Sequence, residues 1–183
     1  PHLPRHVVIL GAGAQGLLAV QLARLAGAEQ VIVSDMIPQR LALAEHVGAT
    51  ITIQADRQNV VQTVMEVTDG WGVEFVIDAV GIATTQQQGV ALLAPAGTLA
   101  LVGLCGPTET KINFAPVVNK EQSLRGTYCY TDDDFKRSLE LLASGQIEVK
   151  EMIHLAPLSE GVTYFERLIH DPAGLTKVVL QPN

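Results

Sequence analysis

Three glycines near the start of the chain, Gly11, Gly13 and Gly16, stand in the spacing GxGxxG between two apolar stretches. Without a Cβ, Gly11 permits a tight turn, Gly13 lets a phosphate approach the backbone, and Gly16 lets a helix pack closely on the preceding strand. The N–H groups around Ala14 and Gln15 then face an anion at the positive end of the helix dipole. The spacing predicts a pyrophosphate-binding turn.

One carboxylate, Asp35, ends the next apolar run, QVIVS. An acid at this place can accept hydrogen bonds from both ribose hydroxyls of an adenosine, and its charge opposes a 2′-phosphate. Arg40, five residues after Asp35, can reach the same adenosine end, where a positive charge would favour the 2′-phosphate of NADP. Because Met36 rather than an arginine follows the acid, we expect NAD to be the cofactor in preference to NADP.

The elements that position these residues alternate between strands and helices. Strands are expected at 7–10, 30–34, 49–53, 74–80, 97–102 and 123–130, and helices at 15–26, 38–47, 59–67 and 84–93. This alternation is typical of βαβ crossovers. The predicted fold class is α/β, a doubly wound parallel six-stranded sheet of the Rossmann type.

The pattern changes after Gly106, and the last part of the chain is predicted to have helices and a strand of its own. DDDFKRSLELLASG is typical of an amphipathic helix with acids in its first turn. A loop, a helix near 160–170 and a terminal strand at 177–180 are expected to follow. We therefore divide the chain into an NAD-binding Rossmann domain, residues 6–130, and a C-terminal segment, residues 131–183.

Composition narrows the classes of protein that need to be considered. Of the 183 residues, 48% are hydrophobic, which permits a sizeable core. The net charge is −7 and there is no basic patch, so nucleic acid is not an expected partner. No apolar run is long enough to span a membrane. Two cysteines, Cys105 and Cys129, give no disulfide framework, which favours a cytoplasmic location.

Several other residues could do chemistry but lack the spacing for it. They are Cys105 and Cys129, His46, His154 and His170, and the acids Asp132, Asp133 and Asp134. The cysteines fit no metal or redox motif, and each histidine lacks a second ligand at helical spacing. The acids are best explained by the helix dipole. No catalytic residue and no metal ligand is predicted in this chain.

Six segments, taken in order, resemble the zinc-type medium-chain alcohol and polyol dehydrogenases. They are GAGAQG, VSD with Arg40 following, LALAEHVGAT, GVEFVIDAVG, LVGLCG and a terminal KVVL. The resemblance covers nearly the whole chain, and the sorbitol, butanediol and threonine dehydrogenase branch is the nearest. In that family this portion is the nicotinamide-binding domain with the C-terminal segment that packs back on the catalytic domain.

The resemblance also implies which residues meet NAD. They are Gly11, Gly13, Ala14, Gln15 and Gly16 at the pyrophosphate, Asp35 and Arg40 at the adenosine ribose, Ala79, Val80 and Gly81 along the adenosine and ribose, Val102, Gly103, Leu104, Thr127 and Cys129 at the nicotinamide, and Lys177 at the pyrophosphate. Thr127 and Cys129 are expected on the sixth strand. The nicotinamide contacts would be made largely through backbone groups.

One large part of the family pattern does not occur in this sequence. The family carries its zinc ligands in an N-terminal domain of the GroES-like type, and a catalytic zinc needs about three protein ligands. Zinc is therefore expected in the parent enzyme only, and this chain alone is expected to be inactive. The expected partners are NAD, the missing catalytic domain and a second copy, paired through the sheet edge at 123–130.

Two other functions fit parts of the sequence. A stand-alone NAD-binding or sensing module would need the same glycines and the same acid. However, residues 152–183 make more sense as a docking segment for a missing domain. A methyltransferase also uses a glycine-rich turn and an acid after the second strand, but Gly16 and the dehydrogenase-like second half argue against it. We therefore expect the chain to be the cofactor-binding domain of a dehydrogenase.

Overall fold

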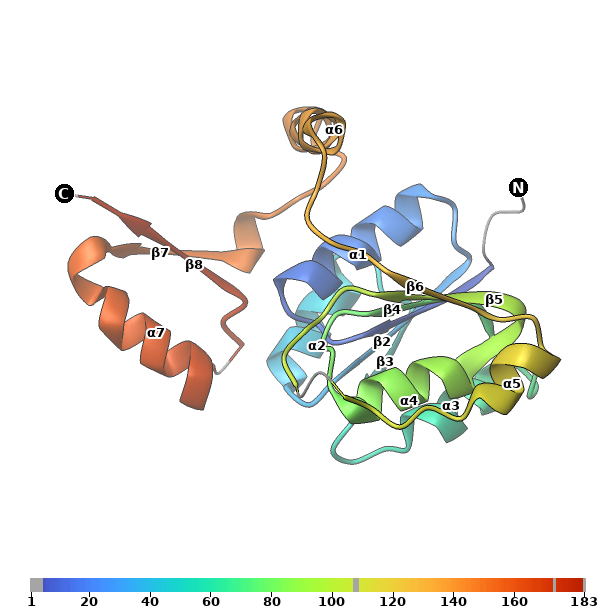
Figure 1. Cartoon of the computed structure of the whole chain (residues 1–183). Coiled ribbons are helices and arrows are strands. Elements are labelled where there is room, and N and C mark those ends of the chain that lie inside the picture. The colour runs from blue at the N-terminus through green and yellow to red at the C-terminus, as the bar shows by residue number, and fades with distance from the viewer. Residues whose placement is uncertain (1–4, 107–108, 173, 183) are drawn as a thin grey trace.

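The structure is a computed structural model that describes residues 5–106, 109–172 and 174–182. A six-stranded parallel sheet runs in the order β3-β2-β1-β4-β5-β6, with helices on both faces (Figure 1). Its elements are β1 (His6–Leu10), α1 (Ala14–Leu25), β2 (Gln30–Asp35), α2 (Pro38–His46), β3 (Ile51–Gln54), α3 (Val60–Val67), β4 (Val73–Asp78), α4 (Ala83–Leu92), β5 (Leu93–Leu101), α5 (Phe114–Asn119) and β6 (Ser123–Gly126). The predicted Rossmann fold is confirmed.

The central strand β1 shows why this sequence forms a doubly wound sheet. Side chains alternate across a strand, and here both sides are apolar. Val7 and Ile9 enter the core beneath α1 and α2, whereas Val8 and Leu10 enter the core beneath α3 and α4. Helices must therefore cover both faces of the sheet. Because the strands are parallel, their carboxyl ends and the loops that follow them lie along the same edge.

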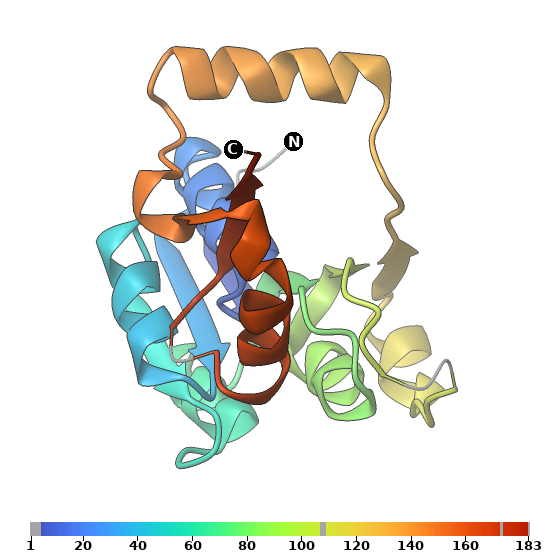
Figure 2. The ribbon, with the colours of Figure 1, turned by 90° about the vertical axis from the view of Figure 1, so that its left-hand side faces the viewer.

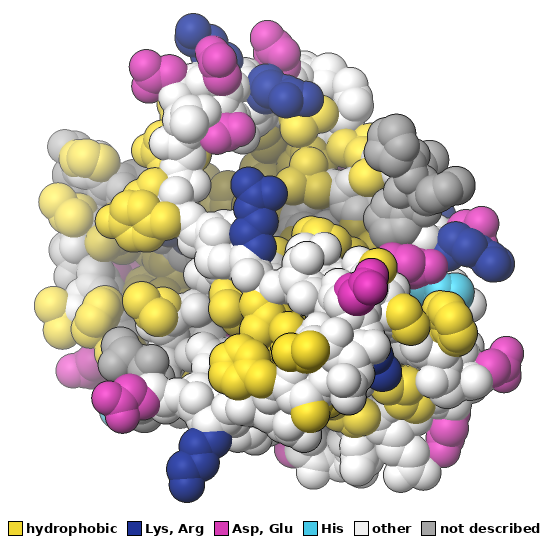
Figure 3. All heavy atoms as spheres, turned by 45° about the vertical axis from the view of Figure 1, so that its right-hand side comes forward, with side chains coloured by type: hydrophobic (Ala, Val, Ile, Leu, Met, Phe, Trp, Pro, Cys, Tyr) yellow, Lys and Arg dark blue, Asp and Glu magenta, His cyan; other side chains and the backbone are white. Residues whose placement is uncertain are grey.

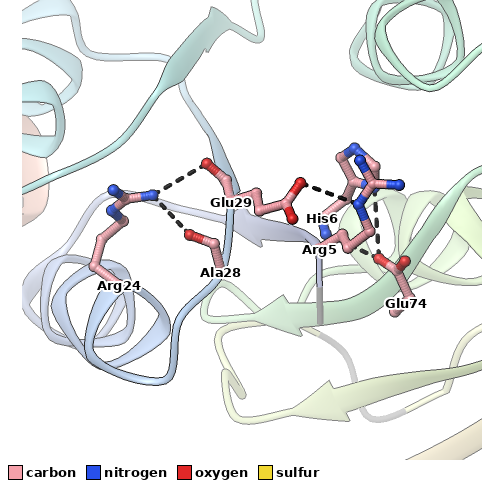
Figure 4. A network of polar contacts seen from close by, with 6 residues as sticks. All are labelled: Arg5, His6, Arg24, Ala28, Glu29 and Glu74. Carbon is pink, nitrogen blue, oxygen red and sulfur yellow. Dashed lines mark hydrogen bonds and ion pairs between the residues drawn. The ribbon is translucent and has the colours of Figure 1, made fainter. Parts of the chain in front are cut away.

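Polar contacts hold the opposite edge, where the strands begin (Figure 4). Arg5 Nε donates to the carboxylate of Glu29 at 3.0 Å, and the His6 N–H donates to the carboxylate of Glu74 at 2.9 Å. Arg24 Nη1 donates to the carbonyl of Glu29 at 3.1 Å. These contacts join the amino ends of β1, β2 and β4.

The sixth strand is shorter than expected and ends at Gly126 instead of Tyr130. The Thr127 N–H still donates to the Leu101 carbonyl at 3.0 Å, but the chain then leaves the sheet. Cys129 has φ of 52°, in the left-handed region, and Tyr128 is 95% exposed. The apolar character of TYCY is therefore no sign of a buried strand, and placing Thr127 and Cys129 on the sixth strand was wrong.

The C-terminal segment contains α6 (Asp132–Ala143), η1 (Lys150–Met152), β7 (Ile153–Pro157), η2 (Leu158–Glu160), α7 (Gly161–His170) and β8 (Lys177–Gln181). β7, where a loop was expected, pairs in parallel with β8 to form a separate two-stranded sheet. α6 lies apart from the large sheet and is joined to the rest of the chain by extended stretches (Figures 1 and 2). Its residues Phe135, Leu139 and Leu142 are exposed.

Candidate nucleotide-binding site

The three glycines form the turn between β1 and α1, and the structure gives each a different environment. Gly11 has φ of +98°, and a Cβ there would lie 2.6 Å from Cγ2 of Val80. A Cβ on Gly16 would overlap the carbonyl oxygen of Gly11, whereas a Cβ on Gly13 would meet nothing within 4 Å. Gly11 and Gly16 are therefore required by close packing, while Gly13 faces open space.

Gly13 is also the N-cap residue of α1, and no side-chain hydrogen bond caps this helix. Ala14 and Gln15 follow as the first two helical residues. The first N–H groups of a helix have no partner within the helix and lie at its positive end. The space in front of Gly13 therefore suits an anion that approaches the backbone.

Asp35 lies beside this turn, at the carboxyl end of β2, and its carboxylate is held by two backbone groups. Oδ2 accepts a hydrogen bond from the Ala12 N–H at 2.7 Å, and Oδ1 accepts one from the Ile37 N–H at 2.9 Å. These bonds fix the orientation of the carboxylate relative to the glycine turn. Since an ionised carboxylate accepts about four hydrogen bonds, each oxygen can still accept from a ligand hydroxyl.

A cleft of about 370 Å³ opens beside Asp35 at the carboxyl edge of the sheet. Its lining residues are Gly11, Ser34, Asp35, Met36, Ile37, Arg40, Ala55, Val80, Ile82, Thr84, Thr85 and Gln88. The cleft thus brings together Gly11 of the glycine turn, Asp35 and Arg40. A larger hollow of about 580 Å³ lies between α4 and the stretch 111–116, away from the glycines and Asp35.

The loops after β4 and β5 press against each other at the same edge. Gly81 has φ of +77°, and a Cβ there would overlap the carbonyl of Gly103. A Cβ on Gly103 would in turn overlap the backbone of Val80. The predicted residues of both loops therefore lie together, and the side chains of Val102 and Leu104 are exposed.

Asp78 organises the loop after β4, and sequence reasoning missed it. Its side chain is buried, with 0% exposed, at the last position of β4. Oδ1 accepts hydrogen bonds from the N–H groups of Val80 at 3.0 Å and Gly81 at 2.9 Å. Oδ2 accepts one from the Thr85 hydroxyl at 3.1 Å. The available signal was an acid that ends an apolar strand just before a glycine.

Of the predicted cofactor residues, Gly11, Asp35, Arg40 and Val80 line the cleft. Thr127, Cys129 and Lys177 are not among the described residues that line it and come from later parts of the chain. Thr127 stays beside β5, where its hydroxyl donates to the Leu101 carbonyl at 3.0 Å. Cys129 is exposed beyond the end of β6, and Lys177 is exposed at the start of β8.

Among the described residues, the C-terminal segment contacts helices α1 and α2 of the large sheet, and one of these contacts joins His46 to Glu151 at 3.4 Å. The side-chain amide of Gln21 accepts from the Glu148 N–H at 2.7 Å and donates to the Glu148 carbonyl at 2.9 Å. Met152 is buried in the core beneath α1 and α2. Further along the segment, Arg40 donates to the carbonyl of Leu175 at 2.7 Å.

The described residues offer no candidate metal centre, since no three His, Cys, Asp or Glu side chains among them lie together as metal ligands would. A zinc site does not fit this part of the chain, and no zinc chemistry is assigned to it. Within the same described ranges, every helix is too short or too polar to cross a membrane.

The sheet order and the glycine turn together define a dinucleotide-type Rossmann fold. Residues 14–144 match the zinc-binding dehydrogenase family, and the chain belongs to that family. The resemblance found in the sequence is thereby confirmed.

Individual relatives agree with this assignment. Sorbitol dehydrogenase of Bacillus subtilis is 29% identical over 178 residues, which are 97% of this chain and 50% of that protein. A probable D-xylulose reductase A of Emericella nidulans is 34% identical over 151 residues, 80% of this chain and 42% of that protein. Alcohol dehydrogenase TADH of Thermus sp. ATN1 has a TM-score of 0.90 at 30% identity, covering 98% of this chain and 51% of that one. The chain spans about half the length of the curated relatives it matches.

Proposed function

We propose that this chain is the NAD-binding part of a zinc-dependent dehydrogenase that transfers hydride between an alcohol or polyol and NAD. The observation that carries the proposal is the open space at Gly13, at the N-terminus of α1, beside a cleft lined by Gly11 and Asp35. An anionic pyrophosphate and an adenosine ribose need these two features side by side. The alcohol and polyol dehydrogenases among the relatives support the substrate class.

Each proposed contact follows from a position in this site. The pyrophosphate would lie on Gly11, Gly13, Ala14, Gln15 and Gly16. Asp35 and Arg40 would hold the adenosine ribose, with Asp35 already oriented by its bonds to the Ala12 and Ile37 N–H groups. Because those bonds keep the carboxylate in place, a 2′-phosphate would meet a fixed negative charge, so NAD is the proposed cofactor.

The remaining contacts concern the reactive end of the cofactor, which supplies a ring carbon that accepts hydride. We assign Val102, Gly103 and Leu104, together with Thr127 and Cys129, to this part, whereas Ala79, Val80 and Gly81 would lie along the adenosine and ribose. Lys177 would reach the pyrophosphate from β8. Since Thr127 and Cys129 lie after β6, their backbone groups would contact the cofactor from a loop.

We divide the chain into the NAD-binding domain, residues 6–130, and the C-terminal segment, residues 131–183, and propose a GroES-like catalytic domain with the zinc ligands as their partner. Apolar side chains on α6 and α7 support a docked partner: Phe135, Leu139 and Leu142 on α6, and Val162, Phe165 and Ile169 on α7 are exposed. Figure 3 shows hydrophobic side chains beneath α6, with acidic and basic ones over its outer side. Without that partner, the chain would turn over no alcohol.

A homodimer in the cytoplasm completes the proposal. β6 pairs only with β5, so its other side is a free sheet edge in the described chain, available to a second copy. The edge strand has only 4 residues, and it includes Arg125. Light scattering of the chain at high concentration measures this association directly.

Calorimetric titration with NAD and NADP tests the proposed cofactor role. The wild-type chain should bind NAD more tightly than NADP. Asp35→Asn keeps an acceptor oxygen but removes the charge, so it should weaken NAD binding and narrow the gap to NADP. Tighter binding of NADP than of NAD by the wild-type chain would contradict the assignment of Asp35.

A further inference from the structure

Arg40 belongs both to the wall of the cleft and to the anchor of the C-terminal segment. It lines the cleft together with Asp35, and its Nη2 donates to the backbone carbonyl of Leu175 at 2.7 Å. Leu175 lies just before Lys177, the first residue of β8. One guanidinium therefore links the site proposed for the adenosine to the strand that carries Lys177.

The turn around Leu175 sits tightly against α2. Gly174 has φ of +89°, and a Cβ there would lie 2.8 Å from the Cβ of Gln39. Thr176 Oγ1 donates to the carbonyl of Met152 at 2.5 Å, which ties the start of β8 to a residue in the core. The turn that leads into β8 is thus held against the first turn of α2 and against Met152.

The bond to Leu175 leaves most of the guanidinium available to a ligand. Arginine has five N–H donors in a rigid planar fork, and this bond uses one of them. Nε is buried and has no hydrogen-bond partner among the residues that the structure describes. The carbonyl of Leu175 therefore orients the fork. The buried Nε is closed to a ligand, so a nucleotide would be met by the remaining N–H groups of the two terminal nitrogens.

We infer that Arg40 is a positioning residue that couples the adenosine cleft to the C-terminal segment. A nucleotide in the cleft strengthens the docking of β8, and docked β8 orients Arg40 for the nucleotide. This coupling is reciprocal, because each partner changes the affinity of the other by the same factor. The inference rests on the proposed function, since it requires the cleft to take the adenosine part of NAD.

Hydrogen exchange of the full chain, measured by mass spectrometry on peptides that cover β8, tests the coupling. NAD is the probe, at concentrations that calorimetry shows to saturate each variant. In the wild-type chain, NAD should slow exchange in β8 about 3- to 10-fold. Lys177→Ala removes the contact proposed between β8 and the pyrophosphate, so the protection that remains in this variant is the part that Arg40 carries. Arg40→Met should lose it, and Arg40→Lys, which keeps a cationic donor, should restore part of it.

Gln21→Leu is the matched control, because it removes the two hydrogen bonds to Glu148, a contact of the segment that does not involve Arg40. It should speed exchange around Glu148 while NAD still protects β8. Without NAD, Arg40→Met should speed exchange in β8 about 3- to 10-fold. This measurement needs no bound NAD, so it tests the Leu175 contact even if the variant binds NAD too weakly to be saturated.

Three results would overturn the inference. Equal protection of β8 by NAD in the wild-type chain and in Arg40→Met would remove Arg40 from the coupling. Unchanged exchange of β8 in Arg40→Met without NAD would show that the bond from Arg40 to Leu175 does not stabilise the docked position of β8. Saturation with NAD and no protection of wild-type β8 would refute the coupling alone, whereas no binding of NAD to the wild-type chain would refute the proposed function as well.

Discussion

The carboxylate of Asp78 accepts a hydrogen bond from the Thr85 hydroxyl at 3.1 Å, across the loop that joins β4 to α4. Its other oxygen accepts two backbone N–H groups of the same loop. Burial of a charge is costly unless such bonds replace its hydration. Asp78 therefore shapes the loop that closes one side of the cleft, although its own side chain is not part of the lining.

Asp78→Ala should lower the free energy of unfolding by about 2–4 kcal/mol, because two N–H groups and a hydroxyl lose their acceptor inside the protein. Asp78→Asn keeps an acceptor oxygen and should cost less. Thr85→Val removes one of the three bonds to Asp78, together with the bond that its hydroxyl accepts from the Ile82 N–H at 3.2 Å. It should cost about 1–2 kcal/mol. Urea denaturation of the three variants measures this order, and an equal loss in all three would contradict it.

Gly16→Ala should destabilise the chain, because the added methyl would overlap the carbonyl of Gly11. Overpacking of this kind costs about 1–3 kcal/mol. Gly126→Ala is the matched control, since a Cβ there would meet nothing within 4 Å, and it should change stability by less than about 0.5 kcal/mol. Thermal unfolding of the pair checks the prediction, which fails if the control loses as much stability as Gly16→Ala.

The N-terminus of α6 should loosen in acid. The carboxylate of Asp134 accepts hydrogen bonds from the backbone N–H and from the hydroxyl of Thr131. These bonds, of which the backbone one has the larger effect, hold the pKa of the Asp134 carboxyl below its usual value of 3.8. Because the folded pKa is lowered, this contribution is fully present above pH 3.8 and is lost as the pH falls through the folded pKa.

An NMR titration of the Thr131 amide should follow this loss in the wild-type chain and in Asp133→Asn. In Asp134→Asn the acid-induced change should be absent. A titration that persists in Asp134→Asn would show that another group controls the cap.

The sequence allowed the glycine turn and the sheet to be predicted because their signals are local. Gly11, Gly13 and Gly16 stand between an apolar strand and an apolar helix, and Asp35 directly ends the next strand. The pairing of β7 with β8 has no local signal, because Ile153 finds its partner, Lys177, only across an intervening helix. For this reason the sequence predicts a loop where the structure has β7.

Asp78 and the end of β6 show a different limit. An acid that ends a strand predicts a ligand as readily as a structural anchor, and only the hydrogen bonds to Val80 and Gly81 separate the two. TYCY has the apolar composition of a strand, yet the left-handed backbone at Cys129 takes the chain away from the sheet. Contacts in the folded chain decide both the role of Asp78 and the end of β6, and neither can be predicted from composition.

Titration of NAD into wild-type chain and Gly13→Asp, followed by calorimetry, tests the central claim most directly. Gly13 has φ of −74° and ψ of −172°, and a Cβ there meets nothing within 4 Å, so Asp fits as an N-cap and should keep the unfolding free energy. Its charge would occupy the place proposed for the pyrophosphate. We predict that the wild-type chain binds NAD and that Gly13→Asp binds it at least about 10-fold more weakly. Equal NAD affinity in two equally stable proteins, or no binding by the wild-type chain, would contradict the account.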